Sequence, residues 1–228
     1  MLLEKQLRAA NPGRQIEVVN MAVPGYTSHQ GLAWLRRDIG KLQPDLVVAS
    51  FGWNDTSMSD APDRETIETN WRVVGARWLI DHSQAFAHAT RWLRAKKQIE
   101  PPSFIKPVPR VSQYEYVNNM LGIVGLARAH GAEAIVIAAP YRDSQTNPQE
   151  AQAMDEYRAA LRSVTRQNQV PFLEILELTE AAYPSNLGWF GELIHPNHMG
   201  HRLIASELLK LLKAQRRLKD LQIPEMIP

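Results

Sequence analysis

The chain has 228 residues, 44% of them hydrophobic and 22% charged, which suits one globular domain. Its 26 Lys and Arg residues nearly balance its 24 Asp and Glu residues, which argues against nucleic acid or an anionic membrane as the main partner. The absence of Cys excludes disulfides, thiolate nucleophiles and Cys-ligated metal centres. No apolar run reaches the length of a membrane span, and the sequence predicts neither a compartment nor an oligomeric state.

Helix and strand patterns alternate along the chain. Apolar residues at helical spacing predict helices at about 3–10, 28–42, 112–130 and 148–167. A last helix presents one apolar face, formed by Leu203, Ile204, Leu208, Leu211 and Leu212. Short apolar runs predict buried strands at 15–20, 46–51, 134–139 and 170–175. Such alternation favours a parallel sheet sandwiched between helices.

Residues 56–109 interrupt this alternation, because they separate two predicted strands by more than an ordinary crossover. We interpret the segment as an insertion. Its middle, 71–97, is predicted to be helical and mixes Trp and Phe with Arg and Lys. That mixture suits a membrane surface or an acidic ligand. A core-packing stripe with a solvated basic face is the commoner role of such a helix, and we favour it.

A cluster of chemically active side chains lies near the C-terminus, at 192–200. Pro196 favours a helix start, so His195 is expected on the loop just before the last helix. Imidazole titrates near neutrality, and the carboxylate of Glu192 can accept its Nδ1 proton and stabilise the imidazolium. The pair predicts the base half of a hydrolytic triad, although spacing alone leaves a capping or surface role as the default.

The histidines of this cluster also allow a metal hypothesis, because neutral imidazole is a zinc ligand. His195, His198 and His201 are the candidate ligands. Pro196 takes His195 off the helix that would align it with the other two. We therefore disfavour a metal site.

Two further groups follow predicted strands. Asn54 and Asp55, after Gly52, lie at the C-terminal end of strand 46–51, where ligands bind in open α/β sheets. The Asn54 carboxamide can donate to a developing oxyanion, and Gly25 can present its backbone N–H to the same site. Each group alone is typical of an ordinary turn.

Taken together, the three groups resemble the motifs of the SGNH (GDSL-type) hydrolases. Residues 20–28, then Gly52-x-Asn54-Asp55, then an acid-x-x-His195-Pro-Asn motif follow in the family's order. The resemblance covers nearly the whole chain outside the insertion. It implies one domain over 1–228 with a flavodoxin-like three-layer α/β/α fold and a parallel sheet. It also implies a hydrolase or O-acyltransferase acting on small-molecule or carbohydrate esters, without a metal or cofactor.

The resemblance also assigns roles. Carried over by motif, the Gly25 N–H and the Asn54 side chain bind the oxyanion, and His195 serves as base and then acid. Glu192 orients His195 at a position where family members usually carry Asp, so the longer side chain needs a different rotamer.

The sequence departs from the family pattern at the nucleophile. The family's serine belongs to a Gly-Asp-Ser motif after the first strand, and neither Gly-Asp-Ser nor Gly-x-Ser-x-Gly occurs in these residues. The helix that follows the motif corresponds to the one that opens this chain. We therefore expect an N-terminally truncated domain that lacks its first strand, folds poorly and is nearly inactive; Ser28 or a water activated by His195 are weaker candidates for the nucleophile.

The alternative is a non-catalytic relative that binds a glycan or an acylated ligand in the same cleft, with the insertion as a lid. The presence of both Asn54 and His195 argues mildly against it. A purely structural interaction protein is the third hypothesis.

Overall fold

The computed structural model describes residues 2–67, 106–141, 147–177, 188–189, 194–214 and 222–223. Its helices are α1 (Leu2–Ala10), α2 (Ser28–Leu42), α3 (Trp53–Thr56), α4 (Asp63–Ile67), α7 (Gln113–Ala129), α8 (Pro148–Gln167) and α10 (His198–Ala214). Its strands are β1 (Leu46–Ala49), β2 (Met58–Ser59), β3 (Val108–Pro109), β4 (Glu133–Ile137) and β5 (Phe172–Leu173). The helix predicted at 71–97 lies outside the described residues.

Within the described residues, three parallel strands form the central sheet, in the order β1-β4-β5. Strand β4 lies in the middle, and its residues from Ala134 to Ile137 are buried. Alternate residues of β4 serve opposite faces, since Ala134 and Val136 join one hydrophobic core whereas Ile135 and Ile137 join another. A sheet buried on both faces explains why these strands read as continuous apolar runs.

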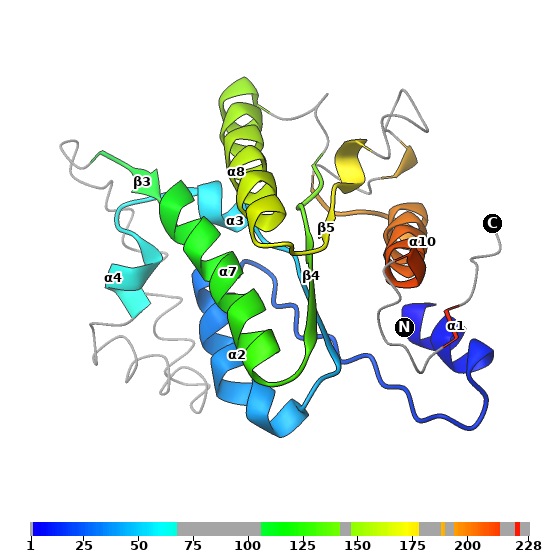
Figure 1. Cartoon of the computed structure of the whole chain (residues 1–228). Helices are drawn as coiled ribbons and strands as arrows, with labels where there is room; N and C mark the ends of the chain where they lie inside the picture. Colours follow the sequence, from blue (N-terminus) through cyan, green and yellow to red (C-terminus); the bar gives the residue numbers. More distant parts are fainter. Residues whose placement is uncertain are drawn as a thin grey trace, which may run out of the picture.

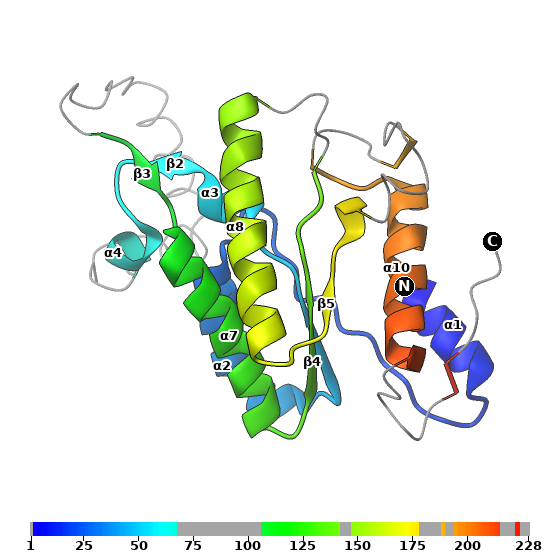
Figure 2. The same ribbon diagram turned by 45° about the horizontal axis from the view of Figure 1, so that its top comes forward.

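Helices cover both faces of the sheet, which gives three layers (Figure 1). Helices α2, α7 and α8 pack on one face through a core that includes Ile39, Met120 and Leu161. Helix α10 covers the other face with Leu208 and Leu212, and α1 lies beside it (Figure 2). The α/β/α architecture predicted from the sequence is confirmed.

The predicted helix starts hold because local side chains cap them. Gln30 accepts a hydrogen bond from the Thr27 N–H at 3.0 Å, which starts α2 at Ser28. Ser112 and Glu115 form a reciprocal capping box at the start of α7. Asn147 caps α8, whose first residue is a proline.

The strand predicted at 15–20 is wrong. Ile16 and Val18 are partly buried and Glu17 and Val19 are exposed, as in an extended chain, yet the segment pairs with none of the described strands. It crosses from the side of α1 to the side of α2 (Figures 1 and 2). A strand requires hydrogen bonds to a neighbouring strand, and the described residues place none at this position.

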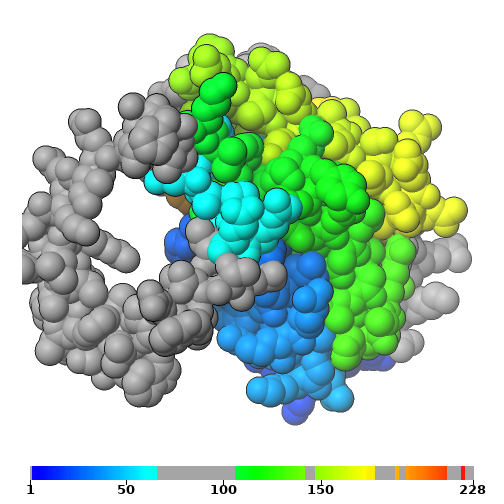
Figure 3. Space-filling model, turned by 90° about the vertical axis from the view of Figure 1, so that its left-hand side faces the viewer, coloured from blue at the N-terminus to red at the C-terminus, as the bar shows by residue number. Residues whose placement is uncertain are grey.

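The two ends of the segment 56–109 meet in a short antiparallel ladder. Strands β2 and β3 pair Met58 with Pro109 and Ser59 with Val108. The backbone N–H of Arg110 donates to the carbonyl of Ser57 at 2.9 Å. The chain therefore leaves and re-enters the domain at one place, and the start of this segment lies beside α2 and α7 (Figure 3). Among the described residues, no helix is both long and apolar enough to cross a membrane.

Candidate active site

Asn54 is positioned by a sharp turn at the C-terminal end of β1. Gly52 is buried and has a φ of +142°, a backbone conformation that side-chain-bearing residues rarely adopt. This turn ends the strand and starts α3, whose second residue is Asn54. The carboxamide therefore lies at the edge of the sheet where ligands bind in α/β proteins.

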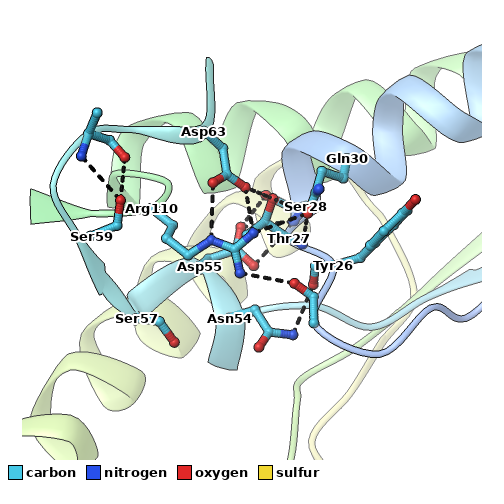
Figure 4. Close-up of polar contacts among 12 residues, drawn as sticks. Tyr26, Thr27, Ser28, Gln30, Asn54, Asp55, Ser57, Ser59, Asp63 and Arg110 are labelled. Atoms are coloured by element: carbon cyan, nitrogen blue, oxygen red, sulfur yellow. Dashed lines mark hydrogen bonds and ion pairs between the residues drawn. The ribbon is translucent and has the colours of Figure 1, made fainter. Parts of the chain in front are cut away.

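The structure brings Asn54 beside the loop that carries Gly25. The Asn54 Nδ2 donates to the backbone carbonyl of Tyr26 at 3.0 Å (Figure 4). Gly25 itself has a φ of +81°, so the loop turns at a residue that tolerates this conformation. One N–H of the Asn54 amide is thereby held, and the second makes no hydrogen bond with the described residues.

Asp55 fastens the same two segments together. Its side chain is fully buried and accepts hydrogen bonds from the backbone N–H of Ser28 at 3.0 and 3.2 Å and from the Ser28 hydroxyl. Asn119 donates to the Ser28 hydroxyl oxygen at 3.1 Å. Burial raises the pKa of the Asp55 carboxyl from 3.8 to about 7, although the hydrogen bonds from Ser28 lower it.

His195 lies on the loop before α10, as the sequence predicts, and it is exposed. Asn197 holds this loop, because its Oδ1 accepts from the N–H groups of Met199 at 2.8 Å and Gly200 at 3.1 Å. The Asn197 N–H in turn donates to the carbonyl of Trp189 at 2.8 Å. Asn197 thus caps α10 and anchors the chain next to His195.

The loop of His195 is tied to the strand ends by packing. Ile194 and Trp53 both pack against the buried cluster of Tyr141, Met154 and Leu176. These contacts place the residues just before His195 and just before Asn54 on one small core. Glu192, the predicted partner of His195, lies outside the described residues.

The described residues contain no group of three His, Cys, Asp or Glu side chains arranged to hold a metal ion. His198 and His201 lie in the first turns of α10, whereas His195 precedes the helix. His195 therefore lies off the helix that carries the other two histidines, as Pro196 predicts.

Two residues near the site carried no signal in the sequence. Arg110 follows β3, Asp63 begins α4, and their side chains form an ion pair beside Gly25. Arg110 stands at the end of a proline-containing stretch that offers no catalytic motif. Only the meeting of β2 and β3 brings it to the loop.

Comparison with known proteins identifies the family and the fold of this chain. The model of the GDSL-like lipase/acylhydrolase family matches residues 1–203. Among solved structures, an acetylxylan esterase from Geobacillus stearothermophilus superposes with a TM-score of 0.62 at 16% identity, covering 92% of this chain and 78% of that chain. A lipase/acylhydrolase from Enterococcus faecalis superposes with a TM-score of 0.61 at 17% identity, covering 99% and 87%.

LAE5, an α/β hydrolase from the metagenome of Lake Arreo in Spain, gives a TM-score of 0.62 at 18% identity and covers 93% of this chain and 79% of its own. None of the curated proteins matches this sequence significantly. The structural likenesses show that this chain has the fold of these enzymes.

Proposed function

Because this chain belongs to the GDSL-like lipase/acylhydrolase family, whose members hydrolyse ester bonds, we propose that its residues supply the base and the oxyanion-binding groups of a serine esterase. The observation that carries the proposal is the contact between Asn54 and the Gly25 loop at the end of β1. That contact aims one amide N–H at the loop and leaves the second available to a substrate.

The oxyanion site consists of the Gly25 N–H and the second N–H of the Asn54 amide. When a nucleophile attacks an ester carbonyl, negative charge develops on the carbonyl oxygen, and fixed donors stabilise it more than they stabilise the ground state. Loss of one such donor costs about 10²- to 10³-fold in turnover. The bond from Asn54 to Tyr26 supports this role because it fixes the amide before substrate arrives.

His195 acts as the general base. It accepts the proton of the attacking serine hydroxyl as the ester oxygen becomes an oxyanion, then gives that proton to the departing alcohol. The acyl-enzyme is released by water, which His195 activates in the same way, or by a second alcohol in an acyl transfer. Glu192 orients the imidazole from three residues upstream and stabilises its cationic form.

The nucleophile comes from a strand that ends in Gly-Asp-Ser, a motif that residues 1–228 do not contain. β1 pairs with β4 along one edge and with no other described strand, and Val48 in the middle of β1 is 40% exposed. A parallel strand on the open edge would end where β1 ends, beside Asn54. These residues by themselves are therefore nearly inactive, since loss of a triad serine costs about a millionfold in turnover.

The test restores the missing group. An apolar strand ending in Gly-Asp-Ser is fused ahead of Met1, and hydrolysis of p-nitrophenyl acetate is compared with that of residues 1–228. We expect activity only in the fusion, and its loss when the added Ser is replaced by Ala or in His195→Ala. A fusion that folds and stays inactive would overturn the proposal, as would an active fusion whose activity is unchanged by His195→Ala.

The substrate class to test next is an acetylated carbohydrate, which the acetylxylan esterase of the same fold supports. The rival hypothesis is a binding protein for a glycan or an acylated ligand. It predicts that residues 1–228 bind acetylated xylo-oligosaccharides in calorimetry with an affinity that the fused strand leaves unchanged.

A further inference from the structure

Arg110 makes contacts with three separate parts of the chain (Figure 4). Its Nε donates to Asp63 Oδ1 and its Nη2 to Asp63 Oδ2, each at 3.0 Å, which is the two-point geometry that best orients a guanidinium. Its Nη1 donates to the backbone carbonyl of Gly25 at 2.9 Å, and its Nη2 also donates to Gln30 Oε1 at 3.2 Å. One side chain therefore joins the start of α4, the Gly25 loop and the first turn of α2.

The carboxylate partner is itself fixed. Asp63 is buried, with a side chain 7% exposed, and it also accepts a hydrogen bond from the Thr27 hydroxyl at 2.7 Å. Its backbone N–H donates to the carbonyl of Arg110 at 2.7 Å. A buried carboxylate thus orients the Arg110 guanidinium. The position of the guanidinium beside the Gly25 carbonyl is fixed before a substrate binds.

The bond to Gly25 has a consequence for the proposed oxyanion site. Asn54 holds the carbonyl of Tyr26 and Arg110 holds the carbonyl of Gly25, so two consecutive peptide groups of the loop are fixed by side chains from elsewhere. The proposed donor is the N–H of Gly25, which lies in the preceding peptide group and is linked to the held carbonyl through the two Gly25 backbone dihedral angles. A change in the Gly25 dihedral angles would turn this N–H away from an oxyanion.

We propose that Arg110, oriented by Asp63, is a positioning residue that holds the Gly25 carbonyl and thereby keeps the Gly25 backbone in its oxyanion-binding conformation. The catalytic part of this inference rests on the function proposed above; the structural part does not. It also gives the segment 56–109 a role, because Asp63 lies within it and Arg110 directly follows it. The segment then supports the active site through its two ends.

A spectroscopic test reports on the bond directly. Gly25-Tyr26 is the only Gly-Tyr pair in the sequence. Labelling with [1-¹³C]glycine and [¹⁵N]tyrosine therefore yields one cross-peak for a carbonyl directly bonded to a labelled nitrogen, and the oxygen of that carbonyl accepts the Arg110 hydrogen bond. The measurement needs no activity and is made on the fusion, with residues 1–228 measured for comparison.

We expect Arg110→Lys to shift this cross-peak in the carbonyl dimension, because an ammonium group cannot reach Asp63, Gly25 and Gln30 together. Asp63→Asn should shift it in the same direction by less, and adding it to Arg110→Lys should have little further effect if the pair acts as a unit. Asp63→Asn also serves as the second variant if Arg110→Lys fails to fold. Arg64→Lys is the control, since Arg64 neighbours Asp63 but pairs with Glu115 at an exposed position.

The fusion adds a kinetic readout. Arg110→Lys should lower kcat about 10- to 100-fold with little change in KM, because the donor is displaced while the binding surface is retained. An unmoved cross-peak in both Arg110→Lys and Asp63→Asn would overturn the inference. A moved cross-peak with unchanged kcat in an active fusion would overturn its catalytic part, whereas an inactive parent fusion would count against the proposed function and leave the spectroscopic result decisive for positioning.

Discussion

At the scale of single residues, Asp55 is the buried acid on which the site depends. Its carboxyl joins α3, the helix of Asn54, to the first residue of α2. Desolvation raises the pKa of Asp55 to about 7 in the folded protein. The unfolded chain exposes the same carboxyl with a pKa near 3.9.

The sign of the resulting pH dependence follows from proton counting. Between about pH 4 and about pH 7 the unfolded chain has lost the Asp55 proton and the folded protein still holds it. The folded state binds more protons there, so the free energy of unfolding falls as the pH rises through this window. Above about pH 7 the free energy of unfolding stays lower than at pH 4 by the full cost of ionising the buried Asp55, on the order of 4 kcal/mol.

Asp55→Asn should remove this penalty, because the amide keeps an acceptor for the Ser28 N–H and carries no ionisable proton. We expect the variant to be less sensitive to pH than the parent across the window and more stable than the parent at about pH 8. Urea midpoints at several pH values measure this. Asp45→Asn is the control, since Asp45 is exposed; parallel pH profiles for the parent and Asp55→Asn would refute the argument.

At the scale of elements, the start of α10 depends on a close approach between chain segments. A Cβ added to Gly200 would lie 2.3 Å from the carbonyl oxygen of Trp189 and 2.7 Å from Pro196 Cβ. No helical residue other than glycine fits there without displacing the loop. The glycine of the Asn197-x-x-Gly200 pattern thus allows the loop of His195 to lie on the helix.

We expect Gly200→Ala to destabilise the protein by about 1–3 kcal/mol, as overpacking does, and to lower the activity of the fusion by moving His195. Gly125→Ala is a matched control on α7, where a Cβ would meet nothing within 4 Å. The higher helix propensity of Ala should make the Gly125→Ala variant more stable than the parent by up to about 1 kcal/mol. Thermal unfolding of the parent and both variants measures these effects. A melting temperature of Gly200→Ala equal to that of the parent would contradict the prediction and show that the loop shifts to accommodate the extra carbon.

At the scale of the whole molecule, the open edge of β1 limits stability. β1 has a partner strand on one side in the described structure, and the extended residues 15–20 have none. Backbone groups left without partners and apolar side chains left in water cost a marginally stable domain much of its margin.

The prediction that residues 1–228 fold poorly follows from this edge. Their circular-dichroism melt should be broad, and the fusion should melt more sharply and at a higher temperature. A fusion with the added strand residues scrambled separates strand pairing from added length. A sharp cooperative melt of monomeric residues 1–228, at the temperature of the fusion, would contradict the prediction.

The sequence by itself determined the features that local patterns encode. The helices at 28–42 and 148–167 have the predicted bounds because apolar spacing and capping side chains lie within the same stretch of chain. The loop position of His195 follows from the residue after it, Pro196. The position of Asn54 was likewise legible, since it directly follows a strand that the sequence predicts and the structure contains.

Only the tertiary structure decided which distant groups meet. The strand predicted at 15–20 does not form because a strand needs a partner, and its apolar pattern cannot say whether one is present. Arg110 and Gly25 are 85 positions apart, and the bond between them exists because β2 and β3 close the segment 56–109. The burial that shifts the pKa of Asp55 is also a property of the assembled fold, because desolvation depends on every segment that packs around the carboxyl.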